Sequence, residues 1–181
     1  AQLTERMLFR GTPTWPEDKS VVELRALGGV LASETYEDRT FLGATLPAEN
    51  ALQAIEIFAD VLQHPVFDTD ELKREIETTL QEERCRLDHP EAFSHQRALA
   101  TAFTEHRLRR ERIASQETFR AITRDKLAEF YRAHYRGENI SVVIVGAVNT
   151  AEVIKRAQPL FGDFEYVEPS SGLGTRDSGL G

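Results

Sequence analysis

Three side chains near the start of the chain have types and spacing that could do chemistry together. Gln2, Glu5 and Arg6 lie on one face of a predicted helix, because residues three and four positions apart are neighbours on a helical surface. The carboxylate of Glu5 could act as a general base. Its neighbours are poor metal ligands, since glutamine is a weak donor and the guanidinium of Arg6 has no lone pair to offer. One candidate catalytic residue therefore lies beside a permanent positive charge.

A second pair of acidic residues lies in a long, highly charged helix that we predict from about Asp70 to about Asp88, with Asp68 or Thr69 as its cap. Glu75 and Glu82 are seven positions apart, a spacing that puts them on the same face about two turns from each other. Acidic residues on a charged helix most often face solvent. The helix pattern alone therefore assigns these two residues no role.

Other reactive residue types are scattered along the chain. Cys85 is the single cysteine, so it forms no internal disulfide, and no sequence signature marks it as a catalytic thiol. The basic run 106–112 is short and lies in an acidic chain, which favours a solvated loop. The histidines, which lack the spacing of metal ligands, are His64, His89, His95, His106 and His134.

Composition limits the class of protein. The chain has 181 residues, of which 40% are hydrophobic and 29% charged, values typical of one globular domain. Its formal charge of -8 argues against a general partner for nucleic acid or anionic membranes. No apolar run approaches the roughly 18 residues of a membrane span, so we expect a soluble protein of unassigned compartment. We expect one domain over residues 1–165 and a flexible, glycine- and serine-rich linker or tail over 166–181.

Helices and a hairpin must position the candidate residues. We predict that the first helix ends near Gly11, before two prolines, and that a helix of about three turns begins at Pro16. Residues 30–36 and 39–46 are expected to form an antiparallel hairpin. Further helices are predicted over 47–62, from 90 to about 103, from 116, over 123–134 and over 150–161.

Two apolar patterns predict burial. The helix that begins at Pro90 has an apolar face that includes Phe93 and Phe103. The run Ile140–Val148 is almost unbroken and is typical of a central strand covered on both faces. Because helices outnumber strands and do not alternate with them, we predict an α+β fold with a mainly antiparallel sheet covered by helices.

Residues 2–12 resemble the signature helix of the insulinase/pitrilysin/mitochondrial processing peptidase family, the inverted zincins, in which His-x-x-Glu-His leads into Met-x-Phe-x-Gly-Thr. Gln2 and Arg6 stand at the two histidine positions. Residues 26–33 are similar to the family's Leu-Gly-Gly-x-Leu-Asn-Ala strand, and residues 130–135 to its Phe-Tyr-x-x-His-Tyr segment. The similarity spans about residues 2–162, and the combination is more specific than any single motif.

The resemblance implies a metallohydrolase-like domain that pairs with a homologous peptidase domain or subunit around an extended peptide. It also implies one or two strands before residue 1, and zinc as the metal of the family. The implied site residues are the general-base position Glu5, the ligand positions Gln2, Arg6 and Glu82, the supporting Glu75 next to those ligands, and the substrate strand Leu31, Ala32 and Ser33. The family strand has asparagine where this chain has Ala32.

These departures predict a degenerate site. We expect no bound zinc and an idle Glu5, because a catalytic zinc needs three protein donors. Three acidic residues without a cation would repel one another, so we expect Arg6 to pair with Glu82 and Glu75.

The leading hypothesis for function is a non-catalytic subunit or domain that pairs with an active homologue and helps to form a peptide-binding chamber. One alternative is an active zinc metalloendopeptidase whose atypical metal site uses Gln2, Glu82 and a group outside this chain. Another is an assembly or dimerisation protein that uses the fold only. Whether the protein is an enzyme stays open.

Overall fold

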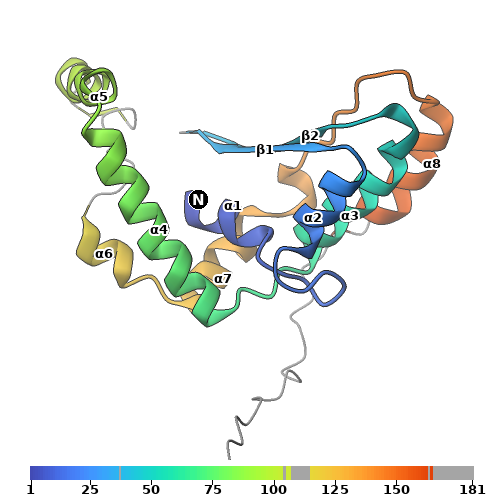
Figure 1. Cartoon of the computed structure of the whole chain (residues 1–181), viewed down its shortest axis with the longest axis horizontal. Coiled ribbons are helices and arrows are strands. Elements are labelled where there is room, and N and C mark those ends of the chain that lie inside the picture. The colour runs from blue at the N-terminus through green and yellow to red at the C-terminus, as the bar shows by residue number, and fades with distance from the viewer. Residues whose placement is uncertain (37, 104, 107–114, 163, 165–181) are drawn as a thin grey trace, which may run out of the picture.

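The computed structural model describes residues 1–36, 38–103, 105–106, 115–162 and 164. The expected tail over 166–181 and most of the basic run 106–112 lie outside these residues. The fold is α+β, with helices packed on one side of a two-stranded antiparallel sheet (Figure 1). In chain order the elements are α1 (Gln2–Leu8), α2 (Lys19–Ala26), β1 (Val30–Thr35), β2 (Thr40–Thr45), η1 (Ala48–Asn50), α3 (Ala51–Gln63), α4 (Thr69–Leu87), α5 (Pro90–Ala102), α6 (Gln116–Arg120), α7 (Arg124–His134), η3 (Gly137–Asn139) and α8 (Thr150–Phe161).

Helix α1 is amphipathic and divides its side chains between the core and the site. Leu3, Met7 and Leu8 are buried in the hydrophobic core. They leave Gln2 and Arg6 on another face, as the helical period requires. The helix stops before Gly11, whose φ of 125° is accessible to glycine and strained for other residues. The start of the chain is thus held as a short helix with a polar face toward the sheet and α4.

Helix α4 has the cap and the length that the sequence predicted. The side chain of Asp68 accepts hydrogen bonds of 2.9 Å from the backbone N–H groups of Asp70 and Glu71, which would otherwise lack partners at the helix start. Leu72, Ile76 and Leu80 follow at four-residue spacing and are buried. Burial of this stripe fixes the rotation of α4, and with it the face that carries the acidic residues.

The hairpin confirms the predicted antiparallel pairing. Its side chains alternate between two faces, and one of these faces lies toward α1. Val30 pairs with Thr45, and Thr35 pairs with Thr40. Leu31 and Leu42 pack against the core, whereas Phe41 on the opposite face is exposed. Gly29 joins α2 to β1 under tight constraint, because a Cβ there would lie 2.5 Å from the carbonyl oxygen of Leu24.

The second helix is shorter than predicted. It begins at Lys19 and not at Pro16, because Glu17 has a positive φ of 58° that a right-handed helix does not admit. Pro16 therefore belongs to the turn after α1, where the backbone N–H of Thr12 donates to the carbonyl oxygen of Trp15 at 2.9 Å.

The prediction of a central strand over 140–148 was wrong for this chain. No strand of the described residues lies along that segment, and Val143 and Val145 are 80% and 92% exposed. A strand needs a hydrogen-bonded neighbour, which the described part of the chain does not supply. The apolar face of α5 is also unburied, because α5 packs mainly against the end of α4 and extends away from the core (Figure 1).

Helices α7 and α8 close the core from the C-terminal half. Tyr131 of α7 is fully buried, and its hydroxyl donates to the carbonyl oxygen of Leu62 at the end of α3. Helix α8 packs along α3, where Arg156 pairs with Glu56. In the described part of the chain, no helix is both long and apolar enough to cross a membrane.

Candidate functional site

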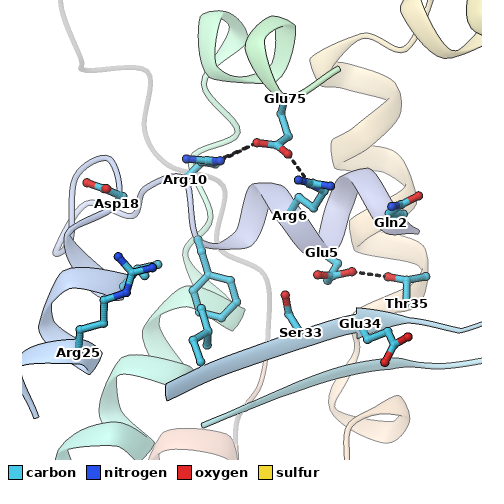
Figure 2. A pocket seen from close by; sticks show the side chains of 13 residues that line it. Gln2, Glu5, Arg6, Arg10, Asp18, Arg25, Ser33, Glu34, Thr35 and Glu75 are labelled. Atoms are coloured by element: carbon cyan, nitrogen blue, oxygen red, sulfur yellow. Dashed lines mark hydrogen bonds and ion pairs between the residues drawn. The ribbon is translucent and has the colours of Figure 1, made fainter. Parts of the chain in front are cut away.

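A polar cavity of about 420 Å³ lies between α1 and β1, with α2 and α4 at its sides (Figure 2). It contains the residues that the sequence singled out on α1 together with side chains from three other elements. The lining residues are Gln2, Glu5, Arg6, Phe9, Arg10, Asp18, Val21, Arg25, Leu31, Ser33, Glu34, Thr35 and Glu75. The cavity therefore joins charged groups that are far apart in sequence.

Arg6 bridges α1 to α4 through both acidic residues. Its Nη1 and Nη2 donate to the two carboxylate oxygens of Glu82 at 2.5 and 2.9 Å, and its Nε donates to Glu75. This fork-to-carboxylate arrangement is the strongest geometry available to an arginine. The pairing expected from the sequence is confirmed. The hydrogen bonds that Arg6 donates to Glu82, together with the negative charge of Glu75, raise the pKa of Arg6 above its ordinary value, so its charge is permanent.

Glu75 is shared between two arginines. Its side chain is 3% exposed, and its second oxygen accepts from Nη2 and Nε of Arg10 at 2.7 and 3.1 Å. A buried carboxylate without partners would be very costly, and here two guanidinium groups stabilise it. The sequence reading missed Arg10. Its position four residues after Arg6 was a signal that could have found it.

Glu5 is buried and is held by the hairpin. Its side chain accepts a hydrogen bond of 2.7 Å from the hydroxyl of Thr35 at the end of β1. Tyr135 lies nearby, and burial, together with the negative charge of Glu5, raises the pKa of its hydroxyl. The sequence did not single out Thr35 as a site residue, although strand alternation puts it on the same face as Leu31 and Ser33.

The three substrate-strand residues divide between two faces. Leu31 and Ser33 line the cavity, whereas Ala32 between them is exposed on the opposite face and pairs with Gly43. Gln2 lines the cavity at the end away from α2 (Figure 2). Glu82 lies outside the lining and reaches the site through Arg6.

The residues at the family's ligand positions do not fit a zinc ion. Both oxygens of Glu82 are used by Arg6, which itself offers no lone pair, so Gln2 would be left as the one free donor. A catalytic zinc takes three protein donors. Across the described residues, no group of three or more His, Cys, Asp and Glu side chains is placed to hold a metal. No zinc-dependent step can be derived from this donor set.

Comparison with protein-family models identifies the class. Residues 1–121 match the model described as insulinase (peptidase family M16), and residues 121–178 match that of the peptidase M16 inactive domain. The chain belongs to the insulinase family, peptidase family M16.

Individual relatives are named as zinc proteases and processing peptidase subunits. An uncharacterized zinc protease of Rickettsia bellii is 28% identical over 94% of this chain and 42% of its own length. The mitochondrial-processing peptidase subunit beta of Dictyostelium discoideum is 26% identical over 94% of this chain and 36% of its own. The chain thus spans less than half the length of these relatives.

Solved structures agree on the fold. A protease from Helicobacter pylori matches with a TM-score of 0.85 and 22% identity, over 97% of this chain and 42% of that one. The first half of the periplasmic protease PqqL from Escherichia coli matches with a TM-score of 0.81 and 22% identity, over 93% of this chain and 38% of that one. At this identity the likeness concerns the fold alone.

Proposed function

We propose that this chain is a non-catalytic peptidase-like domain or subunit that pairs with an active homologous peptidase and helps to form the chamber for an extended peptide. The observation that carries the proposal is the position of the Arg6 guanidinium between Glu75 and Glu82. In the family pattern these places surround the metal. A permanent cation there opposes binding of a divalent metal and occupies the oxygens that would hold it.

Without a metal, the remaining acidic residue has no activated water to work on. A zinc protease needs the ion to lower the pKa of water, and Glu5 alone does not supply that effect. Glu5 is instead tied to Thr35 and buried. We therefore assign it a structural role that joins α1 to the hairpin.

A peptide-guiding role is supported by the edge of β1. In the described part of the chain, β1 pairs with β2 on one side, and its other edge has unpaired backbone groups. Leu31 and Ser33 of this strand line the cavity. An extended peptide can add to such an edge through backbone hydrogen bonds, which need no catalytic residue. The beta subunit among the relatives is named as part of a larger enzyme, which supports a paired state.

The test combines metal content, activity and partnership. The purified protein is analysed for zinc after dialysis, assayed with a quenched fluorescent peptide library, and assayed again with a homologue that has an intact His-x-x-Glu-His motif. We expect no zinc and no cleavage alone, stable association with the homologue, and cleavage by the pair that Glu5→Gln leaves unchanged.

Two other results would support the alternative functions, an active peptidase or an assembly protein. Stoichiometric zinc, with cleavage that both a chelator and Glu5→Gln abolish, would establish an active peptidase with an atypical site. Association with the homologue without any peptide binding would establish an assembly role. Either result would overturn the proposal.

A further inference from the structure

Different charged side chains line the two ends of the cavity between α1 and β1. Arg10, Arg25 and Asp18 lie at the end next to α2, near the start of β1, while Glu5 lies toward the hairpin tip (Figure 2). Arg10 is already paired with Glu75, so Arg25 is the cation of this end without an ion pair to a described residue. The strand rises about 3.3 Å per residue, so the two ends are on the order of 10 Å apart. A peptide along β1 would meet the guanidinium of Arg25 at one end and the carboxylate of Glu5 toward the other.

The arginines of the cavity differ in whether they already form ion pairs within the protein. Arg6 pairs with Glu75 and Glu82, and Arg10 pairs with Glu75. Arg25 forms no ion pair and no side-chain hydrogen bond with any described residue, although Asp18 lines the same cavity. Its guanidinium group is exposed and retains all of its donors for a ligand.

We propose that Arg25 is a specificity residue that binds the carboxylate of an acidic side chain in an extended peptide seated along β1. This inference rests on the proposed peptide-guiding role of the chain and names the peptides that it favours. A guanidinium fork matches a carboxylate in a bidentate contact, whereas the charge of Arg25 would repel a lysine at the same place. The site therefore selects against basic residues at this end despite the charge of -8 on the whole chain.

The position of the acidic residue follows from the strand. Arg25 belongs to the last turn of α2, which leads through Gly28 and Gly29 into β1. The acidic side chain therefore lies beside the first half of β1, near Leu31, and not at the hairpin tip. There Glu5 lines the cavity, and its negative charge would repel an acidic group.

Binding of three fluorescein-labelled peptides tests the inference. The peptides are short, share a Thr, Val and Ser sequence, and differ at one central residue that is Glu, Gln or Lys. Fluorescence anisotropy is measured with the wild-type protein, with Arg25→Glu and with Arg97→Glu. Arg97 is exposed on α5 outside the cavity, so the third protein has the same net charge as the second.

We expect wild type and Arg97→Glu to bind the Glu peptide about three- to tenfold more tightly than the Gln peptide, with a preference that high salt removes. Arg25→Glu should reverse the order in favour of the Lys peptide, while Arg97→Glu should keep the wild-type order. Equal binding of all three peptides to wild type would overturn the role of Arg25 while leaving peptide binding intact. Failure of every peptide to bind would instead remove the proposed function, and the inference with it.

Discussion

Arg6 connects three carboxylate oxygens on α4 to α1, and the exposure of its partners decides how much that connection contributes. Glu82 is half exposed, so its contact with Arg6 competes with water. Glu75 is buried, so each arginine that it loses leaves a charge inside the protein with weaker compensation. Stability should therefore depend on Arg6 mainly through Glu75.

Replacing Arg6 by alanine tests this dependence. We expect Arg6→Ala to lower the free energy of unfolding by about 1–3 kcal/mol, because Arg10 alone would then compensate Glu75. Arg74→Ala is the matched control, since it breaks an exposed pair with Glu71 on the same helix and should cost less than about 0.5 kcal/mol. Urea unfolding measures both variants. Equal costs would show that the Arg6 network does not stabilise the fold.

Restoring two imidazoles tests whether the site is inherited. In Gln2→His/Arg6→His, two histidines at four-residue spacing would face Glu82 after the competing guanidinium is removed. We expect this variant to retain about one zinc per chain after dialysis, with three protein donors, while the wild type retains none. Gln2→His alone is the control and should also lack zinc, because Arg6 remains. Zinc in the wild type at the level of the double variant would contradict the degenerate-site interpretation.

At the scale of the element, α7 and its C-cap residue carry two tyrosines, Tyr131 and Tyr135, whose hydroxyls have different surroundings. Tyr131 donates to the carbonyl oxygen of Leu62, which joins α7 to the end of α3. The hydroxyl of Tyr135 is buried and has no hydrogen bond of normal geometry to a described residue, although Thr40 is close enough to oppose the rise in its pKa. The two rings stack with centroids 5.0 Å apart, so they share one apolar environment.

Removal of each hydroxyl should therefore have different effects. Tyr131→Phe leaves a buried carbonyl without its donor and should cost about 1–2 kcal/mol in the free energy of unfolding. Tyr135→Phe removes an unsatisfied group at nearly constant shape and should change stability by less than about 0.5 kcal/mol, or increase it. Denaturant unfolding of the pair measures the contrast. A larger loss for Tyr135→Phe would mean that its hydroxyl has a partner of real strength.

The raised pKa of Tyr135 also predicts a pH dependence. Above about pH 10 the unfolded chain releases the tyrosine proton, while the folded chain keeps it because burial and Glu5 disfavour the anion. The wild type should therefore lose stability relative to Tyr135→Phe as the pH rises above about 10, and the two should run parallel at neutral pH. Urea unfolding of both proteins over this pH range isolates the effect. The contributions of all other titrating groups cancel in the difference between their free energies of unfolding. Parallel curves throughout would refute it.

The elements that were predicted well are those whose own residues determine their structure. Asp68 caps α4 through its own side chain, and the hairpin follows from two short β-rich runs around a turn. Thr35 and Arg10 were missed because their roles arise from contacts between α1, β1 and α4. A single sequence states which face of an element a residue occupies but not which face of another element it meets.

At the scale of the whole molecule, one strong pattern was misleading for the same reason. The β-branched run 140–148 specifies a strand, yet a strand forms only beside another strand. Its valines are exposed in the described structure. The relatives are more than twice as long as this chain, so they contain polypeptide that could lie beside such a segment. The pattern thus indicates a strand that needs a neighbouring strand, and the described residues do not supply one.

We propose that residues 140–145 pair with a further strand, and so complete the sheet, in a chain as long as the relatives. Val143→Asp tests this proposal in two lengths of the protein. In the present chain Val143 is 80% exposed, so the change should cost less than about 0.5 kcal/mol. In a chain extended to the length of the relatives, the same carboxylate would be buried against a neighbouring strand and should cost about 2–4 kcal/mol. The control is Val22→Asp, at an exposed position on α2, which should change the free energy of unfolding little in both chains. An equally small effect of Val143→Asp in the extended chain would show that residues 140–145 stay uncovered.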